Sequence, residues 1–394
     1  MDKFQQFRAG FPAIKDQTFL SICDKIILHD RVRDAIDEFL DHQAHASANR
    51  VQHEVKVEGA REKFARLMNV ESSTIAAVRN VSDGVNIVAL ALFLVEGDNV
   101  VIATDAEHPN NIYPWLKQQK RGIELRIIDT NADGSLNIDA MIDAIDNRTQ
   151  VLTCATVTFA PGHRTDIHRL GGACRKNDIF FLVDGVQSAG IMHHDLVAEQ
   201  IDGFATSTSK GLLGLYGYGF LYVSPNWIDR MEPAYISRNS VILGVDDHST
   251  MGQHSYTLQP DSRRFEVGSY NLAGAYAVDT SLDMLLDLGT PAIEKRVLSL
   301  ATTFNEGLKS VGVTPAVPAS GPEQSHILTV GKLNAGGHGF STDPTIEPIS
   351  VHLTEGRVAH TIRRGQLRFA IHAYNNESDI ERAIACVQEA LKAK

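Results

Sequence analysis

The stretch Phe180-Phe181-Leu182-Val183-Asp184-Gly185-Val186-Gln187-Ser188 decides the fold of this 394-residue chain. Its first four residues are apolar without interruption, which is typical of a strand buried on both faces, as in a parallel sheet. The run ends on an acid, Asp184. Such sheets bind ligands beyond the carboxyl ends of their strands, so Asp184 lies where a ligand is expected. For this residue alone, an aspartate that caps the next turn is the alternative.

Lys210 follows Asp184 by 26 positions and lies among small residues, in Thr206-Ser207-Thr208-Ser209-Lys210-Gly211. Most loop lysines are solvated, but a lysine whose pKa is lowered by burial is a good Schiff-base nucleophile. Pyridoxal 5'-phosphate needs such a lysine and a carboxylate that keeps its pyridine nitrogen protonated. The pair Lys210 and Asp184 therefore indicates this cofactor. We expect Gln187, three residues after Asp184, to reach the phenolic oxygen of the cofactor.

Strand-like and helix-like segments alternate on both sides of this stretch. This alternation predicts an α/β fold with a mostly parallel sheet that is covered by helices. Two further helices are expected before the sheet, at 30–45 and 51–68. The strands are expected at 74–78, 99–103, 124–129, 151–156, 179–183 and 219–223, and the helices between them at 83–94, 111–120, 138–146 and 167–177.

The C-terminal third has a different pattern. Residues 224–265 lack periodic apolar positions, which predicts an extended loop region at a subunit contact. A long helix at 272–288 is expected to end at Gly289, with Pro291 close behind. Residues 292–394 then indicate a small α+β domain with a final helix from 378. We divide the chain into an N-terminal arm (1–30), a large cofactor-binding domain (31–288) and a small C-terminal domain (289–394).

The composition excludes several classes of protein. A formal net charge of −11 argues against a nucleic-acid or anionic-membrane surface. The first residues lack the apolar core of a signal peptide, and the four cysteines have no CxxC spacing, so we expect a cytoplasmic protein without disulfides. We also expect no metal ion: His193 and His194 are adjacent and cannot easily share one ion, and no HExxH spacing occurs.

Two loops after strands add candidate residues. Asn80-Val81-Ser82-Asp83-Gly84 opens a helix, where free amides and the Ser82 hydroxyl suit a phosphate. An N-cap without a ligand is the alternative. His108 follows the strand at 99–103 and suits stacking on a cofactor ring, although a loop histidine with local hydrogen bonds is the simpler interpretation of His108 alone.

Taken together, these segments resemble the class V aminotransferase family of fold-type I pyridoxal phosphate enzymes. The family includes cysteine desulfurases, kynureninase and isopenicillin N epimerase-like proteins. The resemblance implies a large domain with a mostly parallel seven-stranded sheet and a small C-terminal α+β domain. The matching segments occur in the family's order and are Ser82-Asp83-Gly84, Glu107-His108, Val183-Asp184-Gly185-Val186-Gln187-Ser188, Ser207-Thr208-Ser209-Lys210, Arg264-Phe265-Glu266-Val267-Gly268-Ser269, Leu367-Arg368-Phe369 and Tyr374-Asn375.

The resemblance implies a catalytic role for three residues. Lys210 carries the cofactor and moves the Cα proton, Asp184 pairs with the pyridinium, and His108 stacks over the ring. Gln187 binds the phenolic oxygen.

The resemblance also implies the binding residues. Ser82, Asp83 (through its backbone amide) and Ser207 hold the phosphate. Ser269 contributes to the phosphate of a neighbouring subunit, which implies a homodimer with active sites at its interface. Arg368 binds the carboxylate of an amino-acid substrate, for which a guanidinium fork is well suited. An arginine on a strand that pairs with a neighbouring acid is the alternative for Arg368.

The chain departs from the desulfurases of this family at three places. Ser209 precedes the lysine where they commonly have a histidine. The stretch 349–366, which corresponds to their reactive-cysteine loop, contains no cysteine. Thr156 and Thr158 stand where many members have an asparagine, so the contact to the phenolic oxygen is expected to differ.

We therefore expect an external aldimine and Cα proton abstraction by Lys210. The favoured outcome is β-elimination at a carbon–sulfur or carbon–selenium bond, as in a C–S lyase without a relay cysteine. The alternatives are transamination, epimerisation and, least favoured, a non-catalytic protein of the same fold. The pocket for the substrate side chain is expected from 14–28, 224–260 and 335–352.

Overall fold

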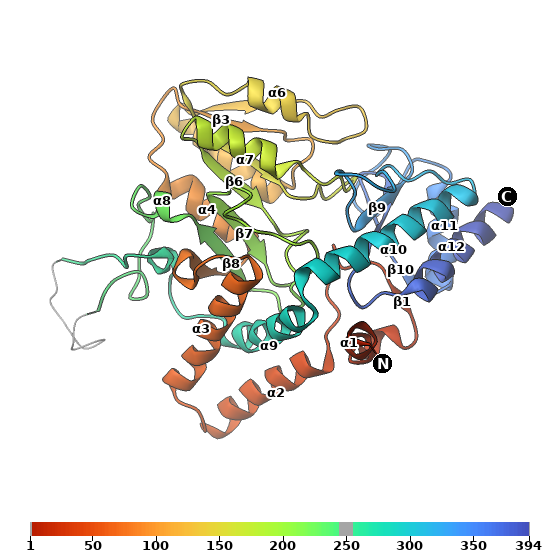
Figure 1. Ribbon diagram of the computed structural model, residues 1–394, viewed down its shortest axis with the longest axis horizontal. Coiled ribbons are helices and arrows are strands. Elements are labelled where there is room, and N and C mark those ends of the chain that lie inside the picture. Colours follow the sequence, from red (N-terminus) through yellow and green to blue (C-terminus); the bar gives the residue numbers. More distant parts are fainter. Residues whose placement is uncertain (1, 244–254, 394) are drawn as a thin grey trace.

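The computed structural model describes residues 2–243 and 255–393, and its largest element is a seven-stranded sheet (Figure 1). The strand order is β2-β8-β7-β6-β5-β3-β4, and only β8 runs antiparallel to its neighbours. The mostly parallel α/β sheet predicted from the sequence is thereby confirmed. Its strands are β2 (Ile75–Val78), β3 (Asn99–Ile102), β4 (Glu124–Ile127), β5 (Thr149–Ala155), β6 (Phe180–Asp184), β7 (Gly203–Ser207) and β8 (Gly219–Val223).

Successive side chains of β6 pack into two different cores. Phe181 and Val183 join one cluster, whereas Phe180 and Leu182 join the other. Because successive side chains of a strand point to opposite faces, the continuous apolar run reflects burial of both faces. One face is covered by α4 (Val81–Ala91), α5 (Tyr113–Gln118) and α8 (Pro225–Ile228), and the other by α2 (Asp30–His45), α3 (Arg50–Leu67), α6 (Ile138–Asp143), α7 (Ile167–Lys176) and α9 (Leu272–Leu288).

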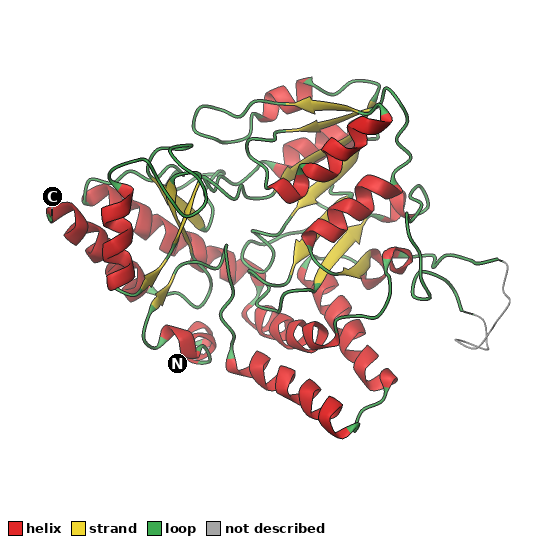
Figure 2. Ribbon diagram, turned by 180° about the vertical axis from the view of Figure 1, so that it is seen from behind, coloured by secondary structure: helices red, strands yellow, loops and turns green. Residues whose placement is uncertain are grey.

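A smaller sheet forms a second unit beside the large one (Figure 2). Its antiparallel order is β11-β12-β9. Gly289 ends α9 with a positive φ of 83°, and Pro291 lies in the first turn of the next helix, as the sequence predicts. The elements of this unit are α10 (Thr290–Ser310), β9 (Ile327–Val330), α11 (Ile346–Glu355), β11 (Thr361–Arg363), β12 (Gln366–Ala370) and α12 (Glu377–Lys392).

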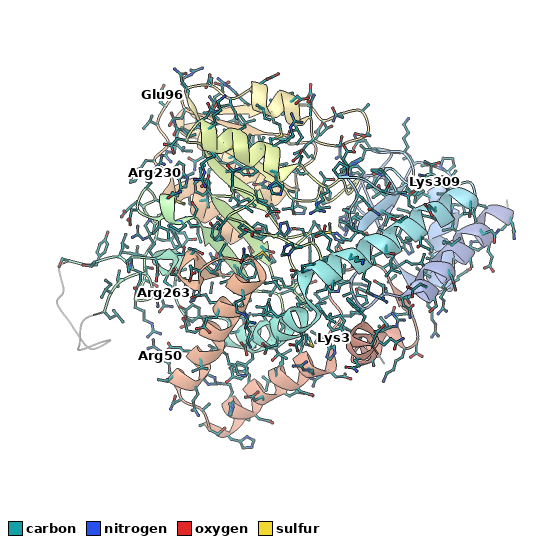
Figure 3. The ribbon with its side chains drawn as sticks, in the orientation of Figure 1. Lys3, Arg50, Glu96, Arg230, Arg263 and Lys309 are labelled. Atoms are coloured by element: carbon teal, nitrogen blue, oxygen red, sulfur yellow. The ribbon has the colours of Figure 1, made fainter. Side chains whose placement is uncertain are left out.

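The N-terminal residues bind to both units. The segment contains α1 (Lys3–Ala9), η1 (Pro12–Ile14) and β1 (Thr18–Phe19), and β1 pairs in parallel with β10 (Val358–Ala359). Arg8 forms an ion pair with Asp379 of α12 at 2.7 Å. On the other side, Lys3 donates a hydrogen bond to the carbonyl of Asp287 in α9 at 3.0 Å, and Figure 3 shows Lys3 beside this helix. The segment therefore joins the small unit to α9 of the large unit.

The structure corrects two details of the sequence-based prediction. Strand β7 was not predicted, because Gly203, Thr206 and Ser207 weaken its apolar pattern. The region 224–265 was predicted as an extended loop; it contains the short helix α8 and a 3-10 turn at Ser262–Phe265, while 244–254 lie outside the described residues. The predicted substrate segment 224–260 overlaps that gap. Among the described residues, none of the helices has the length and apolar character required to cross a bilayer.

Candidate active site

A pocket lies at the carboxyl ends of β5, β6 and β7. The structure brings five residues predicted from separate segments to its wall: His108, Asp184, Gln187, Ser207 and Lys210. The sequence pattern placed Asp184 at a strand end, and β6 does end at this residue. The open edge of a parallel sheet thus collects side chains that are far apart in the chain.

Lys210 follows β7 in a tight turn. The turn packs closely, since a Cβ atom at Gly211 would lie 2.4 Å from the carbonyl oxygen of Ala189. Burial, and then the positive charge of Arg368, lower the pKa of Lys210 from 10.5 to about 8. About a tenth of this amine is therefore neutral and nucleophilic at pH 7, far more than for a lysine of ordinary pKa.

Asp184 is buried, with 3% of its surface exposed. Its Oδ1 accepts a hydrogen bond from the amide of Val186 at 2.9 Å. Burial raises the pKa of Asp184 to about 6, although the Val186 amide and the charge of Lys210 act in the opposite direction. Among the described residues, no cation lies within 4.0 Å of this carboxylate. The charged form of Asp184 thus lacks the cationic partner that a pyridinium would provide.

His108 caps the short 3-10 helix η3 (Pro109–Asn111). Its Nδ1 accepts a hydrogen bond from the amide of Asn110 at 3.2 Å, which places the ring proton on Nε2. Burial, followed by the charges of Lys210 and Arg368, lowers the pKa of His108 to about 4. The ring is therefore neutral at physiological pH. It also contacts Phe159 edge-on, with ring centroids 5.6 Å apart.

The start of α4 provides only part of the predicted phosphate site. The amide of Asp83 donates to the side chain of Asn80 at 3.0 Å, and its carboxylate pairs with Arg79 at 2.7 Å. The Asp83 amide, which was predicted to bind the phosphate, thus donates to Asn80 in this structure, because Asn80 caps the helix. Ser207 is better placed: its Oγ accepts from the amide of Val81 at 2.9 Å in the pocket wall. Ser82, half-buried in the same turn, is not among the residues that line the pocket.

Ser269 and Arg368 also lie outside this pocket. Ser269 lines a different cleft, together with Arg79 and Tyr270. Arg368 is 2% exposed on β12 and donates to the carbonyl of Phe159 at 2.8 Å and to Thr361 Oγ1 at 3.1 Å. Within the described parts of the chain, no carboxylate lies within 4.0 Å of Arg368, so the alternative of a structural ion pair finds no support. Its charge reaches the pocket, as its effects on the pKa values of Lys210 and His108 show.

Thr156 and Thr158 do not face the pocket. Thr156 Oγ1 bonds Ser188 Oγ at 2.7 Å, and Thr158 Oγ1 accepts from the amide of Gly162 at 3.0 Å. Ala155 and Val157 form the wall instead. Neither threonine lines the pocket, so the prediction stays that contact to the phenolic oxygen differs from that of an asparagine.

Sequence reasoning missed two groups near the site. Glu107 is buried beside His108 and accepts from Asn111 Nδ2 and from the amide of Ala155, both at 2.8 Å. Burial raises the pKa of Glu107 to about 8. Arg363 forms an ion pair with Asp24 of the N-terminal segment. Arg363 lies on β11, which pairs with β12, and this pairing puts it near Arg368. A predicted pairing of these two strands would have identified Arg363 as a residue near the site.

The pocket fits pyridoxal phosphate on its own chemistry. A lysine of lowered pKa faces it, and a buried carboxylate without a cationic contact lies at its base. Ser207, whose Oγ accepts from the Val81 amide at the start of α4, still has its hydroxyl proton to donate at one side. An aldehyde, a ring nitrogen and a phosphate would each find a suitable group.

Comparisons with known proteins agree with this description. The model of the family described as Aminotransferase class-V matches residues 27–383. A probable cysteine desulfurase from Methanothermobacter thermautotrophicus is 28% identical over 346 residues, which cover 83% of this chain and 81% of that protein.

Solved structures show the same fold. The apo structure of a cysteine desulfurase from Thermococcus onnurineus NA1 is 22% identical, covers 100% of this chain and 99% of its own, and has a TM-score of 0.85. The cystine C–S lyase C-DES, solved with its reaction product cysteine persulfide, is 20% identical and covers 96% of this chain and 99% of its own, with a TM-score of 0.84.

Proposed function

Because this chain belongs to the class V aminotransferase family, whose cofactor is pyridoxal phosphate, we propose that it cleaves a carbon–sulfur bond of an amino acid by β-elimination. In this reaction the Cα–H and Cβ–S bonds break, a Cα–Cβ double bond forms, and sulfur leaves with the bonding electrons. Water then converts the released enamine to pyruvate and ammonia. A Cβ–Se bond would react in the same way.

The single observation that carries the proposal is the convergence of Lys210, Asp184 and His108 on one pocket, with the pKa of Lys210 lowered to about 8. When bound, pyridoxal phosphate supplies the electron sink for the pair left at Cα. The neutral Nζ of Lys210 takes the Cα proton and holds it. Asp184 stabilises the protonated ring nitrogen, and the neutral imidazole of His108 covers the ring and excludes water.

Binding is assigned to the remaining predicted residues. Ser207 and Ser82 at the first turn of α4 hold the phosphate, and Gln187 binds the phenolic oxygen. Arg368 binds the substrate carboxylate, because its guanidinium has no acidic partner among the described residues and its charge acts on Lys210 and His108. Arg363, which pairs with Asp24, lies near enough to Arg368 for the charge of Arg368 to lower its pKa after burial.

Elimination is favoured over sulfur transfer because the segment that leads to Arg368 has no thiol. This segment comprises α11, β10 and β11, and none of its residues is a cysteine. The four cysteines of the chain are all free and buried. Burial raises the pKa of Cys154, Cys174 and Cys386, which makes these thiols poor nucleophiles. The C–S lyase activity in the name of one structural neighbour provides a precedent for elimination on this fold.

Desulfuration through Cys23 is the second candidate, and one observation favours it. Cys23 lies near enough to Lys210 that a thiolate there would raise the pKa of the amine. A thiol in that position is suited to accept sulfur and release alanine. The names of the desulfurase relatives also point this way.

A substrate screen separates these outcomes. We expect the purified holoenzyme to release pyruvate and ammonia in equal amounts from L-cysteine or L-cystine, without added keto acid. Strict dependence on a keto acid would identify a transaminase, and alanine with thiol-dependent sulfide would identify a desulfurase. Exchange of Cα deuterium without loss of amino acid would identify an epimerase. Protein that stays colourless after incubation with pyridoxal phosphate would refute every catalytic assignment.

A homodimer in the cytoplasm belongs to the same proposal. Ser269 lies in a cleft with Arg79 and Asn80, apart from the pocket of its own chain, as expected for a residue that serves a neighbouring subunit. Sedimentation equilibrium should give twice the chain mass, and Ser269→Ala should weaken cofactor affinity without changing this mass. A stable monomer with full activity would refute the shared site.

A further inference from the structure

A buried histidine without a hydrogen-bond partner lies between two carboxylates, outside the catalytic pocket. His163 has 2% of its surface exposed, and neither of its ring nitrogens has a hydrogen bond. Nε2 lies 4.0 Å from Oδ2 of Asp133, and Nδ1 lies 3.7 Å from Oε2 of Glu323. Burying a polar ring without partners is costly. The arrangement indicates that something else satisfies this imidazole.

The three side chains come from three loops. Asp133 lies between β4 and β5, His163 lies between β5 and α7, and Glu323 precedes β9 of the small unit. One ligand atom from each residue lies within 4.8 Å of the other two. We propose that Asp133, His163 and Glu323 bind a divalent first-row transition metal ion such as Zn²⁺ or Mn²⁺, and that this ion joins the two units.

The chemistry of the three groups fits such an ion. One imidazole nitrogen and two carboxylate oxygens are ligands that these metals accept, and two negative charges match a divalent cation. Both carboxylates are about half exposed, so they are free to move inward to bonding distance, and water has access to the remaining positions. The second ring nitrogen then donates its proton to a carboxylate oxygen or to water, as is usual for metal-bound histidine.

The surrounding contacts orient the ligands. Oδ1 of Asp133 accepts from the amide and the hydroxyl of Ser135, at 2.9 and 2.7 Å, so Oδ2 is the oxygen directed at His163. The carbonyl of Glu323 accepts from the amide of Arg164 at 3.0 Å, which aligns the loop of Glu323 with that of His163. The guanidinium of Arg164 pairs with Glu294 at 2.6 Å and therefore does not neutralise Glu323.

The proposed metal site is connected to Arg368, the proposed substrate-binding arginine, through one loop. The loop that carries His163 also carries Phe159, whose carbonyl holds Arg368 at 2.8 Å. An ion bound at His163 would fix this loop against the small unit. We therefore expect the metal to stabilise the folded chain and to assist Arg368 indirectly, without a part in the chemistry itself.

Metal titration of the holoenzyme tests the proposal. Tag-free protein is treated with a chelator, dialysed and titrated with Zn²⁺ and separately with Mn²⁺ by calorimetry. We expect one saturable ion per chain and a rise in Tm on saturation. Asp133→Asn, Glu323→Gln and His163→Ala should each weaken this binding at least about tenfold. His168→Ala removes an exposed histidine five residues away and serves as the matched control, with unchanged affinity.

Each outcome decides the question. The two amide variants alter half-exposed side chains, so they keep the test valid if His163→Ala fails to fold; the visible cofactor band reports folding of each variant. No saturable binding, or equal affinity in all variants, overturns the proposal. A Tm that does not change on addition of either metal overturns it as well.

Discussion

Replacement of Arg368 by alanine tests the core of the proposed site. Its guanidinium uses Nη1 and Nε for Phe159 and Thr361, and Nη2 has no protein partner among the described residues. The substrate carboxylate is therefore expected to bind at Nη2 and Nη1. A hydrogen bond to a charged group contributes about 1.5–3 kcal/mol, so loss of two costs about 3–6 kcal/mol. This corresponds to a fall in kcat/KM of roughly 10²- to 10⁴-fold.

The same substitution should also change the pKa of Lys210, an effect that a measurement of substrate affinity does not detect. After burial itself, the positive charge of Arg368 is the largest cause of the lowered pKa of Lys210. Without this charge, the protonated amine is less disfavoured, so the pKa of Lys210 should rise from about 8 toward its ordinary value of 10.5. The pH at which the amine becomes reactive should rise with it.

The assay is pyruvate release across a range of substrate concentrations and pH values. Arg368→Lys retains a charge but not the planar fork, so we expect an intermediate loss of kcat/KM and a smaller shift of the pH profile. Arg230→Ala is the matched control: Arg230 lies over the Trp227 ring at the outer edge of the large unit, where Figure 3 labels it. Unchanged KM together with loss of bound cofactor in Arg368→Ala would refute the carboxylate assignment.

Three further results are expected. Lys210→Ala should abolish turnover and the visible absorption of the bound cofactor while the folded state persists; normal turnover in this variant would disprove the assignment. Addition of pyridoxal phosphate to apoprotein should accelerate as pH rises through about 8, because deprotonation of Lys210 creates the nucleophile, and a rate that is flat from pH 6 to 9 would contradict the lowered pKa. Cys23→Ser should retain pyruvate release, since elimination requires no thiol, whereas loss of activity with retained cofactor would favour sulfur transfer through Cys23.

Much of the site could be predicted because its residues belong to a few short sequence segments. Asp184 and Ser207 end β6 and β7, Gln187 and Lys210 lie three residues beyond, and the parallel sheet brings these strand ends together. The phosphate contacts were harder to predict. Asn80 competes for the amide of Asp83, and this competition depends on how the cap side chain folds back onto its helix. The direction of Thr156 and Thr158 likewise depends on the pleat beyond the end of β5.

The sequence by itself determined the fold class and the cofactor. The informative patterns are local: an apolar run that ends on an acid, a lysine among hydroxyl residues, and regular alternation of helices and strands. Local patterns can be recognised directly in the order of residues. Tertiary structure alone decided which charges act on one another. Arg368 lowers the pKa of Lys210, Asp24 pairs with Arg363, and Asp133, His163 and Glu323 meet across three loops. Electrostatic interactions depend on distance and burial in space, and neither can be read from the separation of residues along the chain.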